Sequence, residues 1–289
     1  MALLLELNQY SAYLRLMRLD KPVGIFLLLW PTLWALWLGA DGHPRLDIVV
    51  IFVLGVILMR SAGCIANDLM DRRFDWQVER TRSRPLVTGE VSSLGAMVLC
   101  CFLSFSAFGL VLLCNSTTIQ FACIGMGWVL IYPFLKRVTV FPQLGLGIAF
   151  SWGIPMAFVA ENGTVPFSAW FLFLTSLLWP VIYDTFYAMV DRAEDIQAGV
   201  KSTAIVFGQY TLEIIAALQM TFLLFLVVIG YLFHLHFFYY VGLFISGVFF
   251  IYQLWLIQDH HREQCFKAFL NNQWVGFVIF IGIVLGTHT

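Results

Sequence analysis

Two segments of the chain place Asp side chains, and in one case an Asn side chain, at spacings that would let them act together. They are Asn67, Asp71 and Asp75 in the first segment, and Asp184, Asp191 and Asp195 in the second. On a helix these offsets put the members of each set on one face, so the segments predict a first and a second acid stripe. Like charges on one face repel each other. Each stripe is therefore expected to bind a cation.

The ligands that the acid stripes offer are oxygen atoms alone, because neither stripe contains His or Cys. Proteins hold Mg²⁺ with such ligands, usually a few carboxylates together with substrate phosphates. The stripes are therefore interpreted as facing carboxylates that clamp a Mg²⁺-bound diphosphate. The simpler interpretation, that acids at helix ends are merely solvated, suits a single Asp better than two spaced sets.

The composition indicates what kind of element must position these stripes. Hydrophobic residues make up 61% of the 289 residues and charged residues only 11%, whereas soluble domains carry about 25% charged residues. Uncharged stretches recur that are long enough to cross a hydrocarbon core, which takes about 20 residues of helix. The formal net charge is −1 and no basic tract exceeds two residues. The sequence predicts a membrane protein and excludes a soluble enzyme, a nucleic-acid binder, a disordered chain and a secreted disulfide scaffold.

Nine apolar runs, bounded by charged residues, Gly, Pro or Asn, are predicted to be transmembrane helices. They are residues 22–39, 48–66, 91–113, 117–135, 141–160, 167–187, 212–233, 236–257 and 268–287. The runs are continuously apolar, whereas the strands of a membrane β-barrel alternate. The expected fold class is all-α, a polytopic membrane protein with a bundle of nine transmembrane helices.

The sixteen Lys and Arg residues predict the orientation of these helices, since cytoplasmic loops are enriched in them. With a cytoplasmic N-terminus, fourteen lie in cytoplasmic segments, Arg45 lies outside and Arg60 lies within a span. The loops 67–90 and 188–211 are then cytoplasmic, and each is expected to begin as a continuation of the preceding helix. Basic residues in such loops can reach diphosphate oxygens, although membrane topology alone would also place them there.

Arg60 is the one basic residue inside a predicted span. An arginine at the centre of a membrane helix costs about 2.5–3.5 kcal/mol on insertion scales, and less near an end. It lies seven residues before Asn67, on the same helix face as the first acid stripe. Ionisable groups within a membrane indicate function by default. Two interpretations stay open: Arg60 anchors a substrate carboxylate, or it pairs structurally with Asp184.

Aromatic residues make up 17% of the chain, and their ring faces can stabilise a carbocation. The candidates for lining a cavity are Tyr132, Trp152, Tyr183, Phe186 and Tyr187. The six cysteines form no CxxC pair and have no metal-site spacing, and neither a P-loop nor a dinucleotide fingerprint is present. A zinc site and nucleotide chemistry are therefore not expected.

The acid stripes match two motifs of a known family. Residues 67–75 read N-D-x-x-D-x-x-x-D, and residues 191–195 read D-x-x-x-D with Ala193 and Glu194 in the interval. Longer strings match as well: "MRSAGCIAND" from Met59, "YDTFYAMVDR" from Tyr183 and "GVKSTAIVFG" from Gly199. On these residues the chain resembles the UbiA family of intramembrane aromatic prenyltransferases, over nearly its whole length.

The resemblance implies one domain over residues 1–289, with a central cavity capped by the two cytoplasmic loops. It implies an enzyme of the bacterial inner membrane that uses Mg²⁺ to transfer a polyprenyl chain from polyprenyl diphosphate to 4-hydroxybenzoate, ortho to the hydroxyl, in ubiquinone biosynthesis. The implied metal ligands are Asn67, Asp71, Asp75, Asp191 and Asp195. The implied substrate contacts are Arg60, Arg72, Lys136, Arg137, Asp184 and Lys201. The implied catalytic residues are Asp191, Asn67 and Arg60, and either Asp191 or the released diphosphate would take the ring proton.

Two alternatives stay open. The same chemistry can act on another aromatic acceptor. An ion-coupled transporter can also place carboxylates and an arginine in a helix bundle, but its site is expected near the membrane midplane on broken helices. The acid stripes instead lie at helix ends on one side, which favours the enzyme.

Overall fold

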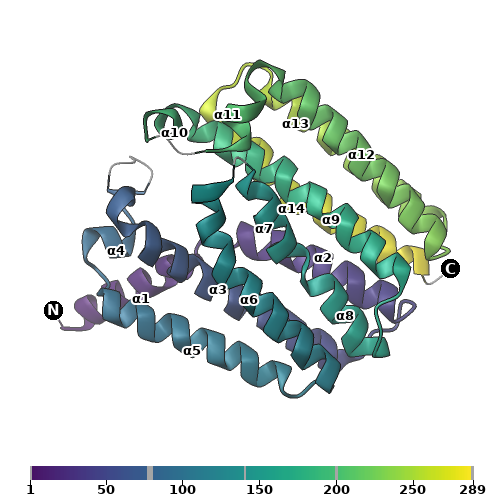
Figure 1. Cartoon of the computed structure of the whole chain (residues 1–289), viewed down its shortest axis with the longest axis horizontal. Helices are drawn as coiled ribbons and strands as arrows, with labels where there is room; N and C mark the ends of the chain where they lie inside the picture. The colour runs from purple at the N-terminus through teal and green to yellow at the C-terminus, as the bar shows by residue number, and fades with distance from the viewer. Residues whose placement is uncertain (1, 77–80, 140, 199–200, 288–289) are drawn as a thin grey trace. The chain divides into compact units, whose positions relative to one another are not determined.

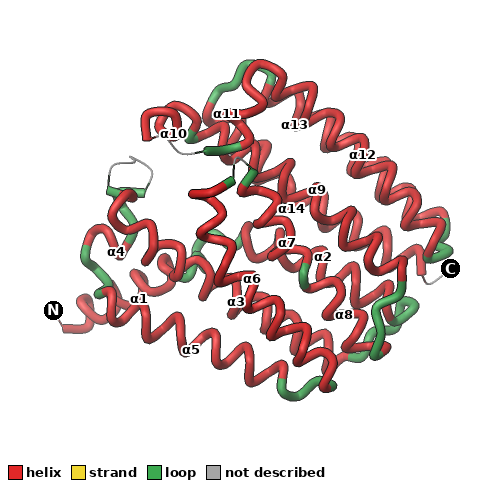
Figure 2. The backbone as a smooth tube through the Cα atoms, viewed as in Figure 1, coloured by secondary structure: helices red, strands yellow, loops and turns green. Residues whose placement is uncertain are grey.

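The structure is a computed structural model, and it describes residues 2–76, 81–139, 141–198 and 201–287. The side chains of residues 2–8, 73–75, 132–138 and 198 also lie outside the described part. Within these limits every regular element is helical, as the tube in Figure 2 shows. The prediction of an all-α fold is confirmed.

The chain forms two compact units. Unit 1 consists of Met1–Ile25 and Val50–Cys114, and unit 2 consists of Phe26–Val49 and Asn115–Thr289. The first acid stripe belongs to unit 1, and the second belongs to unit 2.

Unit 1 packs short and long helices around one apolar cluster. Its elements are α1 (Ala2–Leu16), most of α3 (Leu46–Asp75), α4 (Pro85–Thr88) and α5 (Ser93–Val111). The buried cluster consists of Ala12, Leu16, Ala62, Ile65, Leu86, Val91, Ala96 and Leu103. Local sequence sets the helix ends: Pro85 occupies the first turn of α4, and the Ser92 hydroxyl caps α5 by accepting from Gly95 N (3.0 Å). Gly89 ends α4 with φ 80°, a left-handed conformation that favours glycine.

Unit 2 is built around α9. Its elements are α2 (Val23–Gly39, from Phe26), α6 (Ser116–Val138), α7 (Pro142–Ser151), α8 (Gly153–Asn162), α9 (Phe167–Val190), α10 (Arg192–Ala198), α11 (Thr203–Phe207), the 3₁₀ turn η1 (Gly208–Tyr210), α12 (Thr211–Leu232), α13 (Phe237–Ile257) and α14 (Arg262–Thr287). Helix α9 contacts α7, α8, α11, α12 and α14, while α13 packs on α12 and α14 (Figure 1). The second acid stripe therefore lies at one end of the most enclosed helix of this unit.

Seven helices in the described ranges are long and apolar enough to cross a membrane. They are Leu46–Arg72, Ser93–Val111, Pro142–Asn162, Phe167–Val190, Thr203–Leu232, Phe237–Ile257 and Arg262–Thr287. Two shorter apolar helices, Val23–Gly39 and Ser116–Ile131, coincide with the two remaining predicted runs. The expected positions of the apolar helices are thus confirmed, and the count of nine membrane crossings stays a prediction.

One predicted helix, residues 141–160, is interrupted. Helix α7 ends at Ser151 and α8 begins at Gly153, with Trp152 between them. Pro155 has no N–H, and it lies in the first turn of α8, where that donor would have no partner within the helix. The indole of Trp152 donates to the carbonyl oxygen of Phe121 in α6 (2.8 Å), which holds the junction against its neighbour.

Buried amides join the last helices of unit 2. Gln219 of α12 donates to Gln253 of α13 (3.0 Å), and Gln253 donates to Asn271 of α14 (2.8 Å). Trp179 of α9 donates to Asn272 of α14 (2.9 Å). Side-chain hydrogen bonds between membrane helices contribute about 0.6 kcal/mol each on average. These bonds fix the rotation of α14 against its neighbours.

Gly276 lets α14 approach two tryptophans closely. A Cβ atom at this position would lie 2.4 Å from Cδ1 of Trp30 and 2.5 Å from Cη2 of Trp179. Because overpacking a core costs about 1–3 kcal/mol, we expect Gly276→Ala to lower the melting temperature of the purified protein in detergent. Gly247→Ala is the matched control, since its Cβ would meet only Leu223, at 3.6 Å. Equal melting temperatures for the two variants would contradict this packing.

Candidate active site

The first acid stripe lies on a single helix. Helix α3 continues without a break to Asp75, so positions 67, 71 and 75 occupy successive turns of one face. Asn67 and Asp71 are half-buried, and the side chain of Asp75 lies outside the described part. The prediction that this segment continues the preceding membrane helix is confirmed.

Arg60 lies on α3 two turns before Asn67, against the backbone of Gly24 at the start of α2. A Cβ atom on Gly24 would lie 2.6 Å from Nη2 and 2.7 Å from Nε of Arg60. Only a glycine leaves room for the guanidinium group in this position. Both residues belong to unit 1, whereas Asp184 belongs to unit 2, so the alternative pairing of Arg60 with Asp184 stays untested.

Arg72 and Lys201 occupy different surroundings. The Arg72 side chain is exposed and donates to the Ser93 hydroxyl at the start of α5 (2.6 Å). Lys201 is exposed in the segment before α11. The side chains of Lys136 and Arg137 lie outside the described residues. The substrate contacts expected of all four residues stay predictions.

The second acid stripe does not lie on one continuous helix. Asp184 is half-buried on α9, but α9 ends at Val190 and α10 begins at Arg192. Asp191 is the junction residue, with φ −99° and ψ 5°, and is only 8% exposed. The N–H of Asp195 donates to the carbonyl oxygen of Asp191 (2.9 Å), which keeps these two residues one turn apart. The interpretation of all three as one helix face is therefore wrong, while the spacing of Asp191 and Asp195 is preserved.

Arg262, the first residue of α14, lies against the second motif. Its Nη1 is 2.8 Å from Oε1 of Glu194, and its Nη2 is 3.9 Å from Oδ1 of Asp191. Glu194, which separates the motif's two aspartates, thus has a specific partner on another helix. The sequence offered no signal for this contact beyond the positive charge of a loop residue.

Aromatic rings surround the part of α9 that carries Asp184. The ring of Tyr183 lies 6.3 Å from Phe150, 5.5 Å from Trp179 and 6.2 Å from Phe269. The ring of Tyr187 lies 5.0 Å from Phe269. Phe186 is fully buried, Trp152 is half-buried and the side chain of Tyr132 lies outside the described part. Tyr183 and Tyr187 thus belong to an aromatic cluster beside the second acid stripe.

The arrangement of carboxylates bears on how a metal would be held. Within the described residues, no three His, Cys, Asp or Glu side chains lie together as a metal site. Mg²⁺ is commonly bound by one or two carboxylates plus substrate phosphates and waters, not by an all-protein cage. The described donors of each stripe, all oxygen atoms, fit a cation that arrives with a phosphorylated substrate.

The sequence model of the UbiA prenyltransferase family matches residues 28–284. The chain belongs to this family. It is 53% identical over 281 residues to a 4-hydroxybenzoate octaprenyltransferase of Coxiella burnetii strain RSA 331, covering 97% of this chain and 98% of the relative. It is 54% identical over 273 residues to the enzyme of the same name from Nitrosospira multiformis, covering 94% of each chain.

Solved structures share the fold of this family member. The apo UbiA homologue from Aeropyrum pernix K1 matches with a TM-score of 0.79 at 24% identity, over 91% of this chain and 97% of that one. A UbiA homologue from Archaeoglobus fulgidus bound to GPP and Mg²⁺ matches with a TM-score of 0.65 at 17% identity, over 93% and 99%. These likenesses establish the UbiA fold for the chain.

Proposed function

We propose that this protein transfers a polyprenyl chain from polyprenyl diphosphate to 4-hydroxybenzoate, ortho to the hydroxyl, giving 3-polyprenyl-4-hydroxybenzoate for ubiquinone biosynthesis. The observation that carries the proposal is identity above 50%, over nearly the whole length, to relatives named 4-hydroxybenzoate octaprenyltransferase. Residues 1–289 act as one domain, a bundle of nine transmembrane helices in the bacterial inner membrane. The positive-inside pattern supports a cytoplasmic N-terminus and cytoplasmic acid motifs. In this proposal the acid motifs cap a central cavity.

The proposed cofactor is Mg²⁺, held by oxygens of Asn67, Asp71, Asp75, Asp191 and Asp195. A UbiA homologue bound to GPP and Mg²⁺ supports a divalent cation in this family. Bound there, Mg²⁺ supplies charge neutralisation for the leaving diphosphate. Asn67 and Asp71 are kept in register for this role by the unbroken α3, and Asp191 and Asp195 by the hydrogen bond across the α9–α10 junction.

The basic and aromatic residues perform the remaining tasks. Arg72, Lys136, Arg137 and Lys201 bind the diphosphate oxygens and stabilise the negative charge that develops as the allylic C–O bond breaks. The rings of Tyr183 and Tyr187 face the developing cation and exclude water from it. Asp184, on the same helix, contacts the bound substrates.

The acceptor reacts through its ring carbon. Arg60 holds the carboxylate of 4-hydroxybenzoate by a charge-assisted hydrogen bond and so orients the ring. After the C–O bond of the donor has broken and diphosphate has left, the carbon ortho to the hydroxyl attacks the allylic cation to form the new C–C bond, and that carbon then loses its proton. Asp191 and the released diphosphate are the two candidates for the proton acceptor.

Competition between acceptors tests the assignment of the substrate. Purified membranes receive polyprenyl diphosphate, labelled 4-hydroxybenzoate and an excess of unlabelled aromatic acid. Unlabelled 4-hydroxybenzoate is expected to suppress labelled product, while 1,4-dihydroxy-2-naphthoate leaves it unchanged. Suppression by the naphthoate, with prenylated naphthoate as the product, would overturn the choice of acceptor.

The contact between Gly24 and Arg60 gives a further prediction. We expect Arg60→Ala to raise the KM for 4-hydroxybenzoate by roughly 10- to 100-fold, because a hydrogen bond to a charged group contributes about 1.5–3 kcal/mol. Gly24→Ala should raise the same KM by a smaller factor, since its Cβ displaces the flexible end of Arg60 without damaging the core. Gly109→Ala, which meets no atom within 4 Å, is the control. An unchanged KM in Arg60→Ala would remove the anchoring role.

A further inference from the structure

The aspartate beside Asn67 has a different role from its neighbours in the motif. Asp68 is buried, with 2% of its surface exposed. Nη2 of Arg18 lies 2.9 Å from its Oδ2 and 3.1 Å from its Oδ1, and Nη1 of Arg84 lies 3.0 Å from Oδ1. A buried carboxylate is tolerated when it is paired and hydrogen-bonded in this way. Asp68 is therefore committed to two arginines.

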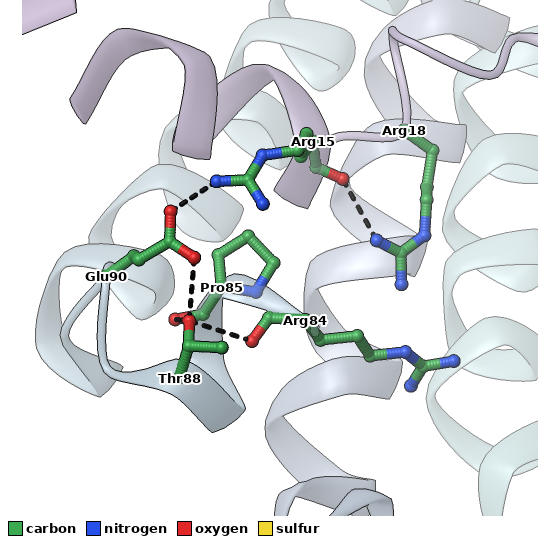
Figure 3. Close-up of polar contacts among 6 residues, drawn as sticks. All are labelled: Arg15, Arg18, Arg84, Pro85, Thr88 and Glu90. Atoms are coloured by element: carbon green, nitrogen blue, oxygen red, sulfur yellow. Dashed lines mark hydrogen bonds and ion pairs between the residues drawn. The ribbon is translucent and has the colours of Figure 1, made fainter. Parts of the chain in front are cut away.

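These contacts continue into a closed ring of interactions within unit 1. Nη1 of Arg18 donates to the carbonyl oxygen of Arg15 (2.9 Å), and the guanidinium of Arg15 pairs with Glu90. The hydroxyl of Thr88 donates to Glu90 (2.8 Å), and its N–H donates to the carbonyl oxygen of Arg84 (3.0 Å). Figure 3 shows the guanidinium group of Arg18 at the carbonyl oxygen of Arg15, and the side chain of Arg84 extending away from Glu90. Asp68 closes the ring by joining these two groups.

The two sides of the ring differ in burial. Arg15 and Glu90 are 37% and 38% exposed, so their pair is screened by solvent and contributes little. The pKa of Glu90 is nevertheless lowered, chiefly by the hydrogen bond from Thr88; burial opposes this shift, and the hydrogen bond and charge of Arg15 add to it. On the other side, Arg84 is only 15% exposed and Asp68 is 2% exposed. Loss of Asp68 would leave two guanidinium groups without their buried counter-ion.

After Asp68, the next carboxylate along α3 is that of Asp71, a member of the first acid stripe. Asp71 lies one helical turn after Asp68, and residues three apart are neighbours on a helix surface. Arg18 also has a left-handed backbone, with φ 58°, which is uncommon for a residue other than glycine. Loss of Asp68 would therefore release the side chain of Arg18, which is held at a strained turn beside the first acid stripe.

We propose that Asp68 is a positioning residue: it supplies the counter-charge for Arg18 and Arg84, so that these guanidinium groups do not compete with metal-bound diphosphate for Asp71. This inference rests on the proposed function. It separates the proposed metal ligands of the motif, Asn67, Asp71 and Asp75, from Asp68, which organises α1, α4 and the turn at Arg18.

The test measures metal binding without turnover. The full chain is purified in detergent, and its melting temperature is followed while Mg²⁺ is titrated at a fixed, saturating concentration of inorganic pyrophosphate. Asp68→Asn should raise the half-saturating Mg²⁺ concentration about tenfold, the scale of one charged hydrogen bond. The double variant Asp68→Asn/Arg84→Gln should return it to within about threefold of wild type, because one released charge is removed. A purely structural role for Asp68 predicts no such recovery.

Glu90→Gln is the matched control, the same carboxylate-to-amide change at the exposed side of the ring. It should leave the Mg²⁺ dependence within about twofold of wild type. The proposal is overturned if Asp68→Asn leaves the Mg²⁺ dependence unchanged, if the double variant is no better than Asp68→Asn, or if Glu90→Gln matches Asp68→Asn.

Two further outcomes are decided by the same titration. If the Asp68→Asn protein cannot be purified in a folded state, the double variant is compared with Arg84→Gln instead. Because only Arg18 is released in the double variant, its half-saturating Mg²⁺ concentration must be about threefold higher than that of Arg84→Gln. Equal values overturn the proposal. A wild-type protein that does not respond to Mg²⁺ with pyrophosphate would overturn the proposed metal-diphosphate site together with this inference. If the wild-type protein responds to Mg²⁺ and only the variants depart from the expected values, the result contradicts the role of Asp68 and leaves the proposed metal-diphosphate site standing.

Discussion

Asp191→Ala is expected to abolish detectable prenyl transfer while the protein still inserts and folds. Asp191 closes α9, is 8% exposed and accepts the hydrogen bond from Asp195 that begins α10. Its carboxylate is proposed to bind the metal that neutralises the leaving diphosphate, and loss of one preorganised electrostatic group at a reacting centre lowers kcat by about 10²–10³-fold. The measurement is kcat in detergent, normalised to folded protein by its melting transition.

Glu194→Gln is the matched control for this variant. Glu194 lies in the same motif but pairs with Arg262 on α14 (2.8 Å). It is expected to keep most of the wild-type kcat, because its role is to hold α10 against α14. Near-normal turnover in Asp191→Ala would eliminate the second motif as a metal site.

Asp71→Ala is expected to have an effect of similar size. Asp71 stands one turn after Asn67 on the continuous α3, so its carboxylate shares a face with the amide of Asn67. Removing it leaves Asn67 as the one proposed ligand of the first acid stripe whose side chain is described, and kcat should fall by about 10²–10³-fold. The half-saturating Mg²⁺ concentration should also rise, which is measured by titrating Mg²⁺ against residual activity in concentrated enzyme.

Thr88→Ala is the control for Asp71→Ala, since Thr88 is exposed and its hydroxyl bonds Glu90 on the exposed side of the ring, not Asp68. Its loss should leave kcat and the Mg²⁺ dependence close to wild type. If Asp71→Ala behaves like Thr88→Ala, the first motif does not bind the metal.

The apolar pattern predicted the helices well because membrane helices are recognisable in a sequence by their length and continuous hydrophobicity. The nine predicted runs coincide with the seven long apolar helices and the two shorter ones of the described residues. The interruption at Trp152 was missed, since an apolar run carries no mark of a break other than Pro155. The junction at Asp191 was missed for a related reason: helical offsets assume a helix that does not stop.

The first acid stripe was predictable because its members are close in sequence, and local periodicity decides which face they share. The residues that the two motifs contact elsewhere in the chain were not predictable. The pairs Asp68–Arg18 and Glu194–Arg262 join residues 50 and 68 positions apart, a separation that only tertiary packing brings together. The close approach of Gly24 to Arg60 was equally hidden, because it depends on how α2 meets α3.

The most direct test is a membrane assay with radiolabelled 4-hydroxybenzoate and a polyprenyl diphosphate, run with Mg²⁺ or with EDTA. The account predicts lipid-extractable label that requires Mg²⁺ and is absent from membranes that carry Asp191→Ala. Absence of labelled product from properly inserted wild-type protein would contradict it. Such a result would point first to another aromatic acceptor and, if none is prenylated, to an ion-coupled transporter.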